Sequence, residues 1–257
     1  MSTDVIRAVA VVIPVHNEAA LLHRCLLAVR AAVREVDPSV QVIVRVVLDD
    51  CTDQSPALVR AHRLVGLPIT ANAVGRARAV GTASALQALR GIPRESIWTA
   101  HTDGDSEVPA GWLTTQLAAA HRGADVFLGT VRPDFADLTA AHREHWIETH
   151  AGGRGVGNVH GANLGIRAST YLAAGGFASV TEHEDAQLVA SCRRRGARIA
   201  ASGRAEVLTS GRLFGRTPGG YAAFVREQAA HFGGAGSAET SPPPRAEELL
   251  DAEERAG

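Results

Sequence analysis

Two aspartates one residue apart, Asp103 and Asp105, follow the apolar segment 97–102. This segment has the composition of a strand, and side chains at positions i and i+2 of an extended chain point the same way. Two carboxylates that converge in this manner can bind a hard divalent cation such as Mg²⁺ or Mn²⁺. Such a cation can clamp a diphosphate and stabilise it as a leaving group. Asp-Gly-Asp also occurs in ordinary turns, so the motif alone leaves a turn open.

Two further acidic clusters could take part in chemistry. Asp49, Asp50 and Asp53 follow a second apolar segment, where they could accept hydrogen bonds from a base or ribose, or cap the next helix and remain solvated. Glu184 and Asp185 open another predicted helix, whose dipole stabilises carboxylates at this end. One of the two could instead face a cleft as a general base that removes a proton from an attacking hydroxyl.

The basic residues beside these motifs have two interpretations as well. Arg212 could pair with a phosphate or remain a solvated surface arginine. His101, His160 and His183 each lie next to one of the motifs. For a single histidine, a structural or surface role is the commoner one.

Alternating strand and helix patterns surround these motifs. Strands are predicted at 9–15, 40–48, 67–71, 97–102 and 124–130, and helices at 19–36, 56–64, 75–89, 109–121, 139–150 and 182–195. The alternation predicts an α/β fold with a mostly parallel central sheet flanked by helices. Ligands bind such sheets at the carboxyl ends of the strands, where the pairs Asp49–Asp50 and Asp103–Asp105 lie.

The composition is that of a globular protein, with 257 residues, 46% hydrophobic residues and a formal net charge of −1. This charge creates no field that attracts nucleic acid or an anionic membrane. The sequence has no signal peptide and no apolar run near the ~20 residues that cross a bilayer. We therefore expect a cytoplasmic protein without a transmembrane segment, in peripheral contact with a membrane only through a partner or substrate. Three scattered cysteines indicate neither a disulfide framework nor a zinc site.

Taken in chain order, five motifs resemble a family 2 glycosyltransferase of the GT-A fold. They are Val12-Ile13-Pro14-Val15-His16-Asn17-Glu18, Asp49-Asp50-Cys51-Thr52-Asp53, Asp103-Gly104-Asp105, Gly161-Ala162-Asn163-Leu164-Gly165-Ile166-Arg167 and Glu184-Asp185. The resemblance covers about residues 9–212. It implies transfer of a sugar from a nucleotide-sugar donor, mostly UDP- or GDP-linked, and mostly with inversion.

The resemblance also implies which residues bind the nucleotide. Pro14, His16 and Glu18 would line the nucleotide pocket. Asp50 would bind the base or ribose, with Asp49 or Asp53 nearby. Phosphate contacts would come from Arg76 and Arg212.

The remaining implied roles concern the metal and the reaction. Asp105 would hold Mn²⁺ or Mg²⁺ on the diphosphate, and Asp103 would approach the ribose or the metal. Asp185 would be the catalytic base, with Glu184 beside it. The acceptor would be a hydroxyl of a small or carrier-linked molecule, because the Gln-x-x-Arg-Trp motif of processive synthases is absent.

The expected organisation is a single catalytic domain over residues 1–234, followed by a disordered tail at 235–257 that is rich in Ala, Ser, Pro and Glu. Its nucleotide-sugar half would be 1–106 and its acceptor half 107–234. Two alternatives remain open. One is a sugar-phosphate nucleotidyltransferase, although the glycine-rich first loop of that class is absent. The other is a non-catalytic module that binds a nucleotide sugar.

Overall fold

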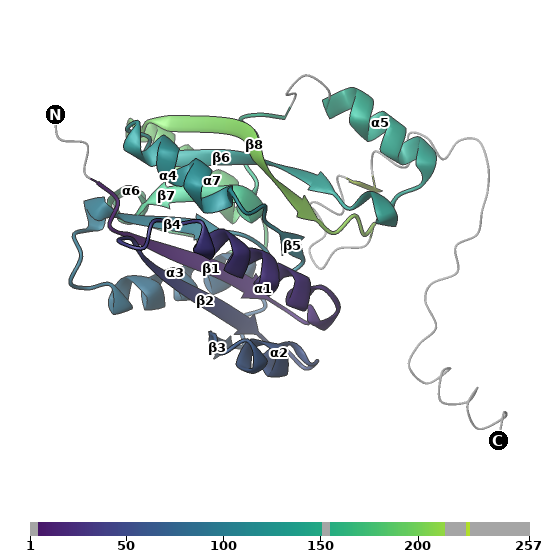
Figure 1. Cartoon of the computed structure of the whole chain (residues 1–257), viewed down its shortest axis with the longest axis horizontal. Helices are drawn as coiled ribbons and strands as arrows, with labels where there is room; N and C mark the ends of the chain where they lie inside the picture. Colours follow the sequence, from purple (N-terminus) through teal and green to yellow (C-terminus); the bar gives the residue numbers. More distant parts are fainter. Residues whose placement is uncertain (1–4, 151–154, 214–224, 227–257) are drawn as a thin grey trace.

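In the computed structural model the described residues are 5–150, 155–213 and 225–226. Within these ranges, eight strands form one sheet in the order β3-β2-β1-β4-β7-β6-β8-β5 (Figure 1). The strands are β1 (Ala8–Val15), β2 (Gln41–Asp49), β3 (Val65–Ile69), β4 (Ile97–His101), β5 (Ser106–Glu107), β6 (Val126–Pro133), β7 (Leu164–Arg167) and β8 (Ile199–Thr209). The prediction of a mostly parallel sheet flanked by helices is confirmed.

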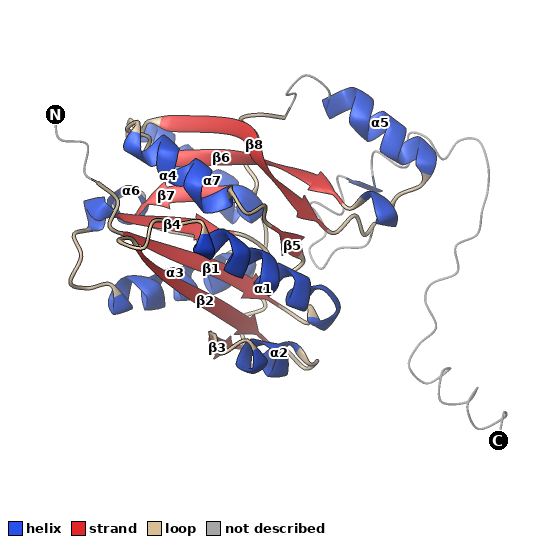
Figure 2. Ribbon diagram, in the orientation of Figure 1, coloured by secondary structure: helices blue, strands red, loops and turns tan. Residues whose placement is uncertain are grey.

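Helices cover both faces of this sheet (Figure 2). They are α1 (Ala19–Arg34), α2 (Ser55–Ala61), α3 (Val74–Ala88), α4 (Trp112–His121), α5 (Ala140–His150), α6 (Ala168–Ala173) and α7 (Glu184–Arg194). Side chains of α1 and α4 belong to one buried apolar cluster with β1 and β4. Those of α6 and α7 pack against β6 and β7 in a second cluster, and α3 contributes to a third with β1.

The strand β1 is apolar on both faces because it lies between two layers of helices. Val11 and Ile13 belong to the cluster that contains α1, whereas Ala10 faces α3. The backbone of α3 comes very close to the sheet at Gly81, where an added Cβ would lie 2.5 Å from Cγ1 of Val12. The small residue therefore sets the distance between α3 and the sheet.

The strand β7 reverses the direction of the sheet in its centre. It pairs antiparallel with both β4 and β6, while β1, β2, β3 and β4 are parallel to one another. The chain between β6 and β7, residues 134–163, consequently leaves the sheet and returns to it at the same edge. This is also the edge at which β1, β2 and β4 end.

Some predicted boundaries differ from the structure for local reasons. The predicted strand 67–71 ends at Ile69, because the backbone N–H of Ala71 donates to the Asp49 carboxylate instead of a neighbouring strand. The predicted helix 56–64 ends at Ala61, and Arg63 adopts a left-handed conformation with φ of 54°. The strands β5, β7 and β8 and the helix α6 were not predicted. The predicted tail at 235–257 lies outside the described residues. Within the described part of the chain, no helix is long and apolar enough to cross a membrane.

Candidate active site

A cavity of about 1220 Å³ opens at the carboxyl ends of β1, β2 and β4. Nine of the sequence-predicted residues line it: Pro14, His16, Glu18, Asp49, Asp103, Asp105, Glu184, Asp185 and Arg212. Two predicted residues, Asp50 and Arg76, are exposed and are not among the lining residues. The fold thus brings together motifs from both halves of the chain.

The carboxylate of Asp105 lies beside Arg212. Nη2 of Arg212 is 2.9 Å from Oδ2 of Asp105, and the guanidinium also makes two hydrogen bonds, of 3.0 and 3.1 Å, with the Glu18 carboxylate. Burial and the neighbouring Asp103 raise the pKa of Asp105 to about 6, although Arg212 acts in the opposite direction. The site therefore concentrates negative charge around one arginine at the end of β4.

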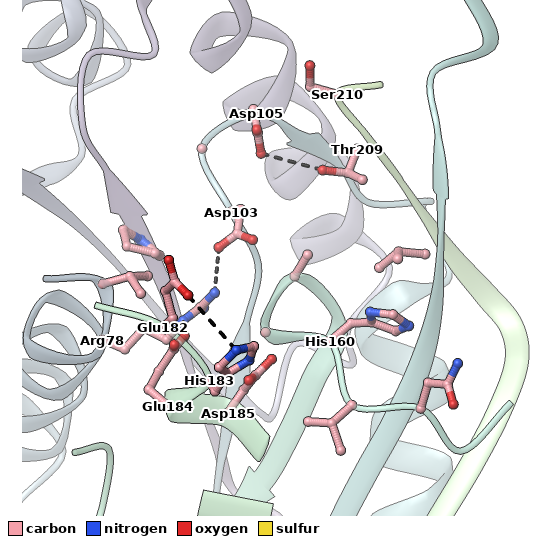
Figure 3. Close-up of a pocket in the computed structure, with 18 of the residues that line it drawn as sticks. Arg78, Asp103, Asp105, His160, Glu182, His183, Glu184, Asp185, Thr209 and Ser210 are labelled. Atoms are coloured by element: carbon pink, nitrogen blue, oxygen red, sulfur yellow. Dashed lines mark hydrogen bonds and ion pairs between the residues drawn. The ribbon is translucent and has the colours of Figure 1, made fainter. Parts of the chain in front are cut away.

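The carboxylate of Asp103 points to a different arginine, Arg78 on α3 (Figure 3). Arg78 is 2% exposed, with Nη2 2.5 Å from Oδ1 of Asp103 and Nε 2.9 Å from Oε1 of Glu184. Burial opposes the charge of Arg78, but the two carboxylates outweigh it and raise the pKa of the guanidinium. Burial also raises the pKa of Glu184, and Arg78 partly offsets this rise. The sequence prediction missed Arg78.

Glu184 and Asp185 are adjacent in the first turn of α7, but their side chains lie in different surroundings. Glu184 is buried in its ion pair with Arg78, whereas Asp185 lines the cavity with a half-buried side chain and accepts a 2.7 Å hydrogen bond from the N–H of Ala186. His160 lies across from Asp185 in Figure 3. Burial lowers the pKa of His160, although Asp185 acts to raise it. At neutral pH this imidazole is therefore neutral.

The carboxylate of Asp49 holds the turn between β3 and α3. It is 4% exposed and accepts backbone N–H groups from Ala71, Asn72 and Ala73 at 2.7 to 3.0 Å. Asp50 has a left-handed conformation with φ of 51° and accepts a 3.0 Å hydrogen bond from Nδ2 of Asn72. These contacts direct the Asp49 carboxylate to the protein backbone and leave Asp50 at the surface.

The turn after β1 is fastened to the turn after β2. Oδ1 of Asn17 accepts the N–H groups of Thr52 and Asp53, at 2.7 and 3.2 Å. In return, Oδ2 of Asp53 accepts the N–H of Ala19 at 2.8 Å, at the start of α1. His16 contacts the carbonyl oxygen of Asp49 through Nδ1 at 2.6 Å. Asp53 therefore fixes the position of the first turn.

Solved structures with similar architecture include glycosyltransferases. The structure of S. aureus TarS 1-349 aligns with a TM-score of 0.57 and 15% identity, over 80% of this chain and 61% of that chain. The mannosyltransferase PcManGT from Pyrobaculum calidifontis, in complex with GDP-Man and Mn²⁺, aligns with a TM-score of 0.55 and 21% identity. This alignment covers 97% of this chain and 69% of that chain. At these identities the likeness shows the fold, which is GT-A. The aligned part of this chain covers 61% of the TarS fragment, which is less than two thirds of its length.

Sequence comparison identifies the family. A search of curated protein sequences gave no match. The family model for glycosyl transferase family 2, in contrast, matches residues 10–175, which is more than half of the chain and includes the motifs at Asp49 and Asp103. The chain belongs to glycosyl transferase family 2.

Proposed function

We propose that the chain is a metal-dependent, inverting glycosyltransferase that moves one sugar from a UDP- or GDP-linked donor to a hydroxyl of a small or carrier-linked acceptor. The observation that carries the proposal is one cavity lined by both Asp103–Asp105 and Asp185. An inverting transfer needs a charge that supports the departing diphosphate and, on the other side of the sugar, a base that faces the acceptor hydroxyl. Carboxylates remote in sequence suit these two tasks.

The donor set near Asp105 fits a hard divalent cation. Among residues 5–150, 155–213 and 225–226, no group of three or more His, Cys, Asp or Glu side chains could hold a metal by itself. Mg²⁺ is commonly bound through one or two carboxylates together with substrate phosphates, so Asp103 and Asp105 are a sufficient protein contribution. We propose that they hold Mn²⁺ or Mg²⁺, which would supply Lewis-acid stabilisation of the diphosphate. Arg212, beside Asp105, would contact the phosphates.

The base in this proposal is Asp185. Glu184 is 5% exposed and its carboxylate is committed to Arg78, so it is less accessible to a bound hydroxyl than Asp185. Asp185 lines the cavity and is half-buried, so it can accept a proton from a bound hydroxyl. We assign Glu184 a supporting place beside the base.

The nucleotide would lie along the turn after β1. Pro14, His16 and Glu18 line this part of the cavity. Asp50 would reach the base or ribose from the rim, because the Asp49 carboxylate already accepts three backbone N–H groups. In this arrangement residues 1–106 bind the donor, with Arg212 reaching its phosphates from the other half, and residues 107–234 bind the acceptor, in one cytoplasmic catalytic domain.

Calorimetric titration with UDP, GDP and their sugar conjugates, with and without Mn²⁺, tests this function. Wild type should bind one nucleotide in a Mn²⁺-dependent manner. Asp105→Asn should abolish that dependence, while Asp37→Asn, an exposed aspartate in the turn before β2, should leave it unchanged. Unaltered Mn²⁺-dependent binding by Asp105→Asn would contradict the metal role. Binding without any transfer to water or to an acceptor would favour the non-catalytic module.

A further inference from the structure

One buried guanidinium connects three segments that are far apart in the sequence. Arg78 is on α3, Asp103 follows β4, and Glu184 opens α7. The ion pairs of Arg78 therefore join residues separated by 25 and by 106 positions. Asp105 lies two residues after Asp103, and Asp185 lies one residue after Glu184. The ion pairs of Arg78 therefore connect the segment that carries Asp105 to the helix turn that carries Asp185.

The surroundings of Arg78 are shaped to hold the guanidinium in one place. An added Cβ at Gly161 would lie 2.4 Å from Nη2, so only a glycine leaves room there. The ring of Phe177 lies under the guanidinium, with Cζ 5.9 Å from the ring centroid. Such contacts with an aromatic face favour a cation. The guanidinium is therefore packed between Gly161 and the ring of Phe177.

A lone charge in this position would be unfavourable. Burying an ion without partners costs several kcal/mol, and removing one member of a buried ion pair leaves an uncompensated charge. Without Arg78, the buried carboxylate of Glu184 and the partly exposed carboxylate of Asp103 would have no cation between them. We expect them to separate, which would move the first turn of α7 away from Asp103.

We propose that Arg78 is a positioning residue that sets the place of Asp185 relative to Asp103 by holding Glu184 through Nε and Asp103 through Nη2 of one guanidinium. Glu184 is then the anchor of the catalytic helix turn and not a second base. The inference rests on the proposed function for the meaning of Asp185, but the connection between the segments is measurable without turnover. A lysine has a single ammonium in place of a planar fork, so it cannot reproduce both contacts.

The first experiment is hydrogen–deuterium exchange of the whole chain, comparing wild type with Arg78→Lys and Arg78→Met. The backbone amides of 184–187 and of 103–106 should lose protection together, while those in β1 and β2 remain as in wild type. Arg90→Lys and Arg90→Met are matched controls, since Arg90 is exposed just after α3, and they should change neither segment. Unchanged protection at 184–187 in Arg78→Lys would overturn the proposal.

A double variant separates positioning from stability. Arg78→Met could unfold because it leaves Glu184 buried and unpaired, whereas Arg78→Met with Glu184→Met removes both charges and should recover thermal stability. If Arg78 serves stability alone, activity should return with stability. If it positions Asp185, kcat should stay about 100-fold below wild type, with a smaller change in KM for the donor, because a misplacement of about 1 Å has effects of this size.

The activity readout is nucleotide release from UDP-glucose or GDP-mannose in the presence of Mn²⁺, with water as acceptor. Wild-type kcat in the stable double variant would overturn the positioning role. Failure of wild type to bind or cleave any nucleotide sugar would instead count against the proposed function. The exchange measurement would still decide whether Arg78 joins the two segments, so the two failures are distinguishable.

Discussion

Replacing Asp105 by asparagine should change how the stability of the protein depends on pH. The Asp105 carboxyl is buried next to Asp103, and these two effects raise its pKa from 3.8 to about 6 in spite of Arg212. In the unfolded chain the carboxyl returns to its ordinary pKa, so the folded state binds more protons between pH 4 and 6. This contribution to stability is fully present below pH 4 and is lost as the pH rises through 6.

The size of the effect follows from the rise in pKa. A rise from 3.8 to about 6 corresponds to about 3 kcal/mol, at about 1.4 kcal/mol for each unit of pKa. Asparagine has nearly the same shape and does not titrate. The free energy of unfolding of wild type, minus that of Asp105→Asn, should therefore fall by about 3 kcal/mol between pH 2 and pH 7, and most of this fall occurs between pH 4 and pH 7.

Urea denaturation at a series of pH values, followed by tryptophan fluorescence, measures this difference. Asp37→Asn is a control with the opposite sign, because hydrogen bonds from Ser39 lower the pKa of the exposed Asp37. The free energy of unfolding of wild type, minus that of Asp37→Asn, should rise as the pH rises from acidic values. A difference for Asp105→Asn that stays flat or increases over the same range would refute the reasoning about the Asp105 site.

Three other changes have direct readouts. Asp185→Asn should keep donor affinity in calorimetry and slow transfer by about 10²- to 10⁴-fold, and a rate within tenfold of wild type would exclude it as the base. Gly81→Ala would place a methyl group 2.5 Å from Val12 and should cost about 1–3 kcal/mol in urea denaturation, whereas Gly91→Ala, in open space, should not. Mn²⁺ should raise the melting temperature of wild type but not of Asp105→Asn.

The strands that end at the cavity were predictable from the sequence because their burial leaves a strong pattern. The strand β1 is apolar at almost every position, as expected for a central parallel strand covered on both faces. Acidic residues directly after β2 and β4 then marked the edge where a ligand can bind. Parallel pairing brought these residues together without further information.

The strands that were missed depend on partners remote in sequence. The strand β8 contains Gly203, Arg204 and Glu206, and it has little strand character by itself. Its pairing with β6 decides its conformation, including a register irregularity between Gly129 and Val131. Strand propensity depends on such neighbours, which a local pattern does not contain.

The choice between Arg76 and Arg78 shows the same limit within the site. Both are on α3, two positions apart, and residues at this spacing point to different sides of a helix. Arg78 lies on the side that also carries Gly81 and Ala85, both buried against the sheet. A single sequence does show this row of small residues, and it was the available sign that Arg78 points inward.

The reversal at β7 has a consequence for how this architecture can change. Residues 134–163 leave and rejoin the sheet at the same end, since β6 and β7 are antiparallel and Leu128 of β6 pairs with Leu164 of β7. This segment contributes α5, with Trp146 and His150 in the cavity wall. An insertion in the part around α5, away from Gly161 and its contact with Arg78, would leave the register of the sheet intact. The part around α5 can therefore vary in sequence and length while the strands that end at the cavity keep their pairing, and in the proposed function this variation would change the acceptor side of the cavity.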